Sequence, residues 1–134
     1  MISPLSTKVR YVGYVDPAKR RELYEGAKLL VQPSFEEGFG LTVLEAMTVG
    51  VPVVAANRGA LPEVVGDAGP LIDAEDVAGF ADAIDAIVND PVAATSAAAR
   101  GLERARLFSW DRTALTMLEA YKAAIARHAE RRPN

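Results

Sequence analysis

The sequence predicts an α/β fold in which a parallel sheet is flanked by helices. Short apolar segments that end at turn residues alternate with segments of helical periodicity, a pattern typical of strand–helix–strand units. Residues 51–56 are almost entirely apolar, as expected for a strand that is covered on both faces. The 134 residues are enough for one domain with a modest hydrophobic core.

The first part of the chain predicts two strands and a helix between them. We expect a short strand at residues 9–12 and a helix over residues 17–26. Asp16 can cap that helix, and the proline at its first position favours a helix start. Residues 29–32 indicate a buried strand that is closed by Pro33.

The middle of the chain predicts two more strands, each preceded by a helical segment. A helix is expected over residues 41–48, with Gly50 suited to its C-terminal stop. The apolar strand 51–56 follows, and residues 60–65 are expected to form a short helical turn. Residues 70–72 predict the last short strand.

The last part of the chain predicts three consecutive helices. Residues 76–89 carry apolar side chains at helical spacing, and residues 92–107 are rich in alanine and arginine. Ser109 can cap a third helix over residues 110–129. The alanine-rich stretch Ala93–Ala99 is expected to lie on the helix surface.

Composition excludes several classes of function. The net charge of −3 and the pI near 5.2 provide no basic field, so we expect no nucleic-acid partner. No cysteine is present, which excludes disulfides and thiolate metal sites. The start, Met1 to Lys8, lacks the apolar core of a signal peptide, and no apolar run approaches the ~20 residues that span a bilayer. We therefore expect a soluble cytoplasmic protein.

The most informative segment is residues 33–47, in which Glu37 and Glu45 flank a Gly-Phe-Gly turn that opens a helix. A helix N-terminus offers unpaired N–H groups and a partial positive charge, and glycine lets a ligand approach the backbone. Such a turn can hold a phosphate, while carboxylates accept hydrogen bonds from sugar hydroxyls. A diphosphate together with hydroxyl donors describes a nucleotide-sugar.

Further motifs follow the E-x7-E pair of Glu37 and Glu45. They are Ala46-Met47, Gly50-Val51-Pro52-Val53-Val54-Ala55, Gly59-Ala60-Leu61-Pro62-Glu63-Val64-Val65, Gly69-Pro70-Leu71-Ile72 and Phe108-Ser109-Trp110. From about Val9 to about Tyr121, the chain resembles the C-terminal, nucleotide-sugar-binding domain of group 1 (family-four) retaining glycosyltransferases, which have the GT-B fold.

The resemblance implies a Rossmann-like parallel sheet with flanking helices. Residues 1–134 would then be a single partial GT-B C-terminal domain, with a core at about 9–108 and a C-terminal helix at about 110–129. The whole N-terminal, acceptor-binding domain would be missing. The first strands of the donor domain, with the Arg and Lys that the family uses on the diphosphate, would be missing as well.

The resemblance also assigns roles to residues. Glu37 would be the catalytic residue, orienting the donor sugar through its hydroxyls and stabilising an oxocarbenium-like state. Glu45 would grip the ribose hydroxyls. The rest of the donor site would comprise Gly38, the backbone N–H groups of Phe39, Gly40 and Leu41, and the hydroxyl of Thr42. The family is metal-independent and uses no cofactor, and the substrate would be a UDP-, GDP- or ADP-sugar.

Simpler readings exist for several of these residues. Glu45 could be an acid that only stabilises the N-terminal part of its helix. Gly38 and Gly40 could form a plain tight turn, and Phe39 is expected to pack and shape the turn. The whole run of motifs outweighs these readings for the two glycines and Glu45.

Three functions are compatible with the sequence. The first is hexosyl transfer by a retaining glycosyltransferase, with this chain supplying the donor-binding half and showing no turnover alone. The second is a non-catalytic, truncated nucleotide-sugar-binding module, and the third is a GT-B-like epimerase or an unrelated Rossmann-like domain. Because strands would be absent beside residues 29–32, we expect residues 9–12 to pair there directly, or a dimer or partner chain to complete that edge. Peripheral membrane association is expected of the full enzyme only.

Overall fold

The computed structural model describes residues 8–130, so the expectation about a signal peptide falls partly outside the described residues. The elements in chain order are α1 (Pro17–Glu25), β1 (Leu30–Gln32), α2 (Leu41–Thr48), β2 (Val53–Ala56), α3 (Leu61–Val65), β3 (Leu71–Ile72), α4 (Val77–Val88), α5 (Pro91–Ala105) and α6 (Trp110–Glu130). The alternation of strands and helices confirms the α/β class.

The described strands form a three-stranded parallel sheet in the order β1-β2-β3. Leu30 lies opposite Val53, and Ala55 lies opposite Leu71. All four residues of β2 are buried, as the apolar run predicts. The observed strand starts at Val53, two residues later than predicted. The N–H of Val51 instead donates to the carbonyl of Ala46 at the end of α2, at 3.0 Å, and the next residue is a proline, which has no N–H to donate.

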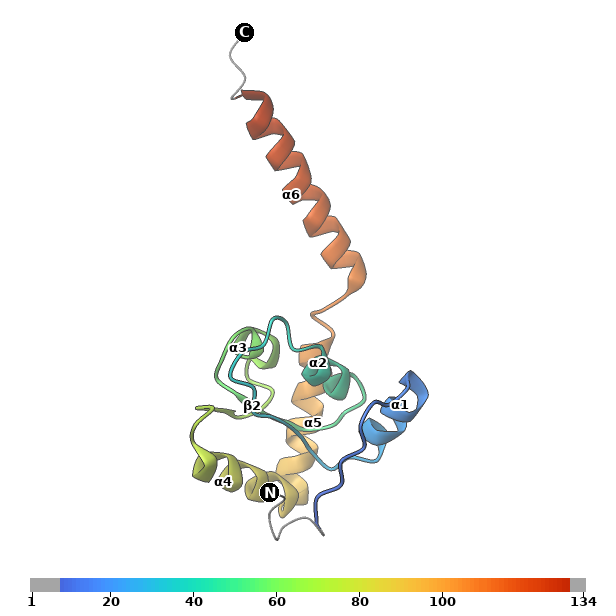
Figure 1. Cartoon of the computed structure of the whole chain (residues 1–134), viewed down its shortest axis with the longest axis vertical. Helices are drawn as coiled ribbons and strands as arrows, with labels where there is room; N and C mark the ends of the chain where they lie inside the picture. The colour runs from blue at the N-terminus through green and yellow to red at the C-terminus, as the bar shows by residue number, and fades with distance from the viewer. Residues whose placement is uncertain (1–7, 131–134) are drawn as a thin grey trace.

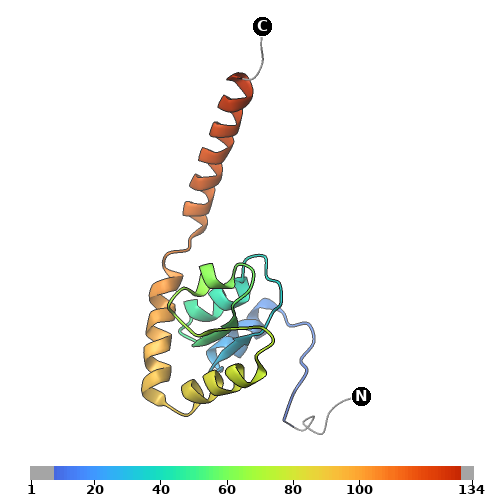
Figure 2. The ribbon, with the colours of Figure 1, turned by 90° about the vertical axis from the view of Figure 1, so that its left-hand side faces the viewer.

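Helices cover the sheet on both sides (Figures 1 and 2). The crossover helices α2 and α3 lie on one side, and α4 lies on the other (Figure 2). α5 packs against both α2 and α4 and so joins the two sides. The largest fully buried side chains of the core are Met47, Leu61, Val43, Val53, Val54, Val64 and Val65. Burial of apolar side chains such as these is the dominant favourable contribution to folding.

The expectation that Ala93–Ala99 lies on the helix surface is wrong in part. Ala97 is only 2% exposed, and a Cβ atom at Gly101 would lie 3.3 Å from the side chain of Met47. The small residues of α5 therefore form a face on which α2 packs closely. A purely compositional reading could not separate this face from the exposed one, since alanine suits both.

The predicted helix caps are present. A side-chain oxygen of Asp16 accepts a hydrogen bond from the N–H of Lys19 at 2.9 Å, and the Ser109 hydroxyl accepts one from the N–H of Arg112 at 3.1 Å. Gly50 adopts a φ of 75° just after α2, a conformation that glycine takes without steric cost.

The predicted strand at residues 9–12 is wrong. This segment has no assigned secondary structure and pairs with no described strand, and Val9, Tyr11 and Val12 are exposed. A strand requires a neighbour for its N–H and C=O groups, and the described sheet ends at β1 without recruiting this segment. Direct pairing of residues 9–12 with β1 is therefore wrong too, whereas association of two chains through the β1 edge stays a prediction that sedimentation analysis can test.

The last helix, α6, projects away from the rest of the chain (Figures 1 and 2). Leu115, Tyr121 and Ile125 of this helix are at least 60% exposed, whereas Met117 and Leu118 are 49% and 48% exposed. Among residues 8–130, no helix is long and apolar enough to cross a membrane.

Candidate functional site

The site begins with the turn that joins β1 to α2. Gly40 is the N-cap of α2 with a φ of 92°, and no side chain caps the helix. Gly40 is buried, and a Cβ atom there would lie 3.1 Å from Leu61. The first hydrogen bond of the helix runs from the N–H of Leu44 to the carbonyl of Gly40 at 3.0 Å. The N-terminal N–H groups of α2 thus have no capping side-chain acceptor, a condition that suits anion binding.

Glu37 lies in this turn, beyond the carboxyl end of β1. One carboxylate oxygen accepts a hydrogen bond from the amide of Gln32 at 3.3 Å, and its main-chain carbonyl accepts one from the N–H of Ala60 at 3.0 Å. Gly59 packs on the same peptide, since a Cβ atom there would lie 2.5 Å from the Glu37 carbonyl oxygen. The loop before α3 therefore holds the backbone of Glu37 in place.

Glu45 lies one turn into α2, and its carboxylate is turned toward α1. The phenol of Tyr24 donates to one oxygen at 3.0 Å, and the guanidinium of Arg20 lies 3.3 Å from the other. Partial burial raises the pKa of Tyr24, and the hydrogen bond and charge of Glu45 raise it further, against smaller opposing effects of Arg20 and Thr42. The phenol is therefore a protonated donor to Glu45 at neutral pH.

Phe39 packs rather than standing free in the turn. Its ring meets that of Phe108 edge to face, with ring centroids 6.2 Å apart. The guanidinium of Arg104 lies 5.6 Å from the centroid of the Phe108 ring and also donates to the carbonyls of Glu63 and Val64. A single chain of contacts thus links the turn to the segment between α5 and α6 and to α3.

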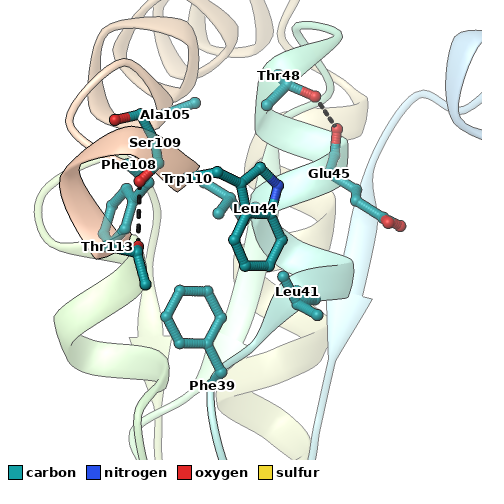
Figure 3. Close-up of a pocket in the computed structure, with 10 residues that line it drawn as sticks. All are labelled: Phe39, Leu41, Leu44, Glu45, Thr48, Ala105, Phe108, Ser109, Trp110 and Thr113. Carbon is teal, nitrogen blue, oxygen red and sulfur yellow. Dashed lines mark hydrogen bonds between the residues drawn. The ribbon is translucent and has the colours of Figure 1, made fainter. Parts of the chain in front are cut away.

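A cavity of about 310 Å³ lies between α2 and the start of α6 (Figure 3). Its apolar lining includes Phe39, Leu41, Leu44, Phe108 and Trp110. The carboxylate of Glu45 points away from this group of side chains (Figure 3). Glu45 thus borders a mainly apolar cavity, while its carboxylate points away from the cavity and contacts α1.

The predicted site residues divide between these places. Of the predicted set, Phe39, Leu41 and Glu45 line the cavity, whereas Glu37, Gly38, Gly40 and Thr42 do not. Gly38 is exposed with open space around it. Within residues 8–130, no group of three or more His, Asp or Glu side chains could hold a metal ion.

Sequence reasoning missed the two residues that contact Glu45. Arg20 and Tyr24 are spaced i, i+4 on the predicted helix 17–26, so they share one face of it. That spacing was the available signal, but it does not reveal which element the face meets.

Comparison with known families gives one match. A family model described as "Glycosyl transferases group 1" matches residues 1–90.

Several curated relatives match most of this chain. O-antigen chain mannosyltransferase B of Escherichia coli is 46% identical over 114 residues, which are 85% of this chain and 30% of that protein. A D-inositol 3-phosphate glycosyltransferase of Nocardioides sp. is 42% identical over 86% of this chain and 26% of its own length. The same-named protein of Mycolicibacterium smegmatis is 38% identical over 91% of this chain and 29% of its own length. The chain thus spans 26–30% of the length of these relatives.

A solved structure shares the fold. Sucrose-phosphate synthase from Thermosynechococcus elongatus superimposes with a TM-score of 0.80 at 35% sequence identity. The match covers 92% of this chain and 32% of that one.

Proposed function

The chain belongs to the group 1 glycosyl transferases and forms part of their Rossmann-like GT-B fold, and from this premise we propose that it supplies the donor-binding half of a hexosyltransferase. The complete enzyme transfers a hexosyl group from a nucleotide-sugar to an acceptor, with retention at the anomeric carbon and without a metal ion. The observation that carries this proposal is the uncapped N-terminus of α2 behind Gly40, with Glu37 and Glu45 on either side.

The distal phosphate, the sugar and the ribose of the donor each have a matching group in the turn or in α2. The distal phosphate lies at the N–H groups of Phe39, Gly40 and Leu41, where the helix dipole and the backbone donors favour an anion. The Thr42 hydroxyl adds a donor beside them. The sugar hydroxyls donate to Glu37, and the ribose hydroxyls donate to Glu45. Several relatives carry glycosyltransferase names, which supports the reaction class.

The transfer step needs little covalent chemistry from the protein. The bond between the anomeric carbon and the phosphate oxygen breaks, and its electron pair stays on the diphosphate. The acceptor oxygen bonds to the same face of the anomeric carbon, and its proton passes to the diphosphate. Glu37 orients the sugar and stabilises the positive charge that develops on the ring, an electrostatic contribution that grows in the transition state.

Calorimetric titration with UDP, GDP, ADP and their hexose conjugates tests the donor site. We expect one nucleotide to bind, and Glu45→Ala to weaken it about 10-fold or more because a charged acceptor is lost. Glu36→Ala is the matched control, since Glu36 is an exposed neighbour in the same turn. Glu37→Gln is expected to weaken the nucleotide-sugar more than the free nucleotide, and EDTA is expected to change neither.

The outcomes separate the candidate functions. Failure of every nucleotide to bind, or equal binding by the Glu45→Ala variant, would contradict the donor site. Binding that Glu37→Gln leaves unchanged would favour a module that holds nucleotides without acting on sugars. Appearance of an epimer of the bound sugar, detected by NMR without any acceptor, would favour the epimerase.

A further inference from the structure

Two side chains of α1 reach across to α2 and end on one carboxylate. Tyr24 donates to Oε2 of Glu45 at 3.0 Å, and Arg20 lies 3.3 Å from Oε1. The two donors are one helical turn apart, so they stand on the same face of α1. Both oxygens of Glu45 therefore have a partner from α1.

This pairing differs from the other charge pairs of α1. Lys19 pairs with Glu22 at 2.6 Å and Arg21 with Glu25 at 2.7 Å, both within the helix and both exposed. Exposed pairs of this kind contribute little to stability. The side chain of Arg20 instead contacts Glu45 on another helix; Arg20 is 49% exposed and Glu45 is 38% exposed. α1 has no buried residue, so these polar contacts are prominent among its attachments to the rest of the chain.

The hydrogen bond from Tyr24 and the ion pair with Arg20 give Glu45 a preferred orientation and leave it able to bind more. A free glutamate side chain samples several rotamers, and that freedom is lost when a ligand binds. An ionised carboxylate has about four lone-pair sites, so the phenol of Tyr24 and the nearby guanidinium of Arg20 leave about two or more for further hydrogen bonds. A carboxylate held in this way has already met part of the entropic cost of binding.

We propose that Tyr24 and Arg20 are positioning residues that orient the Glu45 carboxylate to accept hydrogen bonds from the 2′- and 3′-hydroxyls of a nucleoside diphosphate. This inference rests on the proposed function, because it assigns the α1 face of Glu45 to the ribose. The ribose then lies on the α1 side of α2, and the apolar cavity on the other side stays free of it.

The test pairs protein variants with matched ligands. UDP, GDP and ADP are each titrated beside the 2′,3′-dideoxy form, with wild type, Tyr24→Phe and the control Tyr121→Phe, whose ring is 60% exposed on α6. For wild type we expect the dideoxy form to bind about 10-fold more weakly. Tyr24→Phe is expected to bind the ribose form about 3- to 10-fold more weakly than wild type does, and to bind the dideoxy form as wild type does.

Arg20 is tested in the same way with its neighbour as the control. Arg20→Gln is expected to weaken the ribose form selectively. Arg21→Gln removes one positive charge from the same helix, and it is expected to leave both forms unchanged because Arg21 pairs with Glu25 of its own helix. A purely structural role of α1 would weaken both ligand forms equally, and that outcome would overturn the proposal.

The failures can be told apart. If wild type binds no nucleotide, the proposed function and this inference both fall. If wild type prefers the ribose form and Tyr24→Phe keeps the full preference, only this inference falls. A readout without ligand is the titration of the Tyr24 ring carbon by NMR: Glu45→Gln is expected to lower the pKa of Tyr24, and an unchanged pKa would contradict the contact.

Discussion

Gly59 sets how closely the loop before α3 approaches the turn that carries Glu37. Its φ of 55° favours glycine, and a Cβ atom there would lie 2.5 Å from the carbonyl oxygen and 2.8 Å from the nitrogen of Glu37. Backbone atoms cannot yield as a flexible side chain can. The position therefore demands glycine on two grounds, conformation and space.

Substitution at Gly59 should affect both stability and the site. We expect Gly59→Ala to lower the free energy of unfolding by about 1–3 kcal/mol. Gly38→Ala is the control in the same loop, since nothing lies within 4 Å of its added Cβ, and it should change stability by about 1 kcal/mol or less. Urea unfolding measures both, and an equal effect of the two substitutions would contradict this account.

Tyr24 makes stability depend on alkaline pH. Its pKa is raised above the usual 10.0, so the folded state holds the phenol proton more tightly than the unfolded state. The resulting stabilisation is complete below the unfolded pKa and is lost as pH rises through the folded pKa. We expect the stability difference between wild type and Tyr24→Phe to shrink above about pH 10 in urea unfolding curves. A difference that is constant or grows with pH would show that the phenol is not held by Glu45.

At the scale of residues, the sequence predicted the candidate site residues but not their contacts in the folded chain. The glycines of the turn follow from local conformational preference, and Gly40 adopts the positive φ that suits glycine. The contacts of Glu45 with Arg20 and Tyr24 depend on how α1 lies against α2, which no local pattern encodes. The roles assigned to Glu37 and Glu45 stay predictions until the ligand titrations are done.

At the scale of elements, Arg104 of α5 ties α3 to the body of the fold. It donates from Nε to the carbonyl of Val64 at 3.1 Å and also to the carbonyl of Glu63, close to the end of α3. Helix ends leave carbonyls without intrahelical partners, and a guanidinium fork can satisfy two at once. We call these two hydrogen bonds of Arg104 the clamp. Because α3 directly follows the loop that contains Gly59, the clamp also helps to hold that loop against the backbone of Glu37.

Removal of the clamp should lower the stability of the fold. We expect Arg104→Met to destabilise the fold by about 2 kcal/mol, because two charge-assisted hydrogen bonds disappear. Arg104→Lys should be intermediate, since lysine keeps the charge without the fork. Arg106→Met is the control, as Arg106 is exposed and pairs with the exposed Glu103 at 2.5 Å, and it should change stability by about 0.5 kcal/mol or less. Thermal or urea unfolding that ranks Arg106 with Arg104 would contradict the clamp.

Element prediction succeeded where local signals were strong. The caps at Asp16 and Ser109 and the apolar run of β2 define their elements without tertiary information. Residues 9–12 have strand-forming composition, yet they find no partner among the described strands. The buried alanine of α5 was missed for a related reason, because burial there is decided by the neighbouring helix.

At the scale of the whole molecule, the chain provides the proposed donor site of the transfer reaction. It spans 26–30% of the length of the relatives reported above. The acceptor and the cations that meet the diphosphate are expected, by resemblance, on parts of the family fold outside the matched region. Net charge is −3, so an anionic donor must rely on local groups such as the N-terminus of α2.

The 134-residue polypeptide should therefore bind a donor without turning it over. We expect no release of nucleoside diphosphate above the blank from UDP-, GDP- or ADP-hexose, because no acceptor is held near the anomeric carbon. Enzymatic detection of the released nucleotide measures this. Sustained release or sugar transfer by the purified polypeptide would contradict the prediction.

Trp110 stands where α6 leaves the body, at the mouth of the apolar cavity, and it is 79% exposed. It is also the single tryptophan of the chain. The tryptophan fluorescence of this protein therefore comes from one known position. Its emission should resemble that of an indole in water, and anything that fills the cavity or covers the start of α6 should move the emission to shorter wavelength. A ribose bound on the α1 side of α2 should leave the emission wavelength of Trp110 unchanged. Fluorescence of the unlabelled protein can therefore distinguish binding on the two sides of α2.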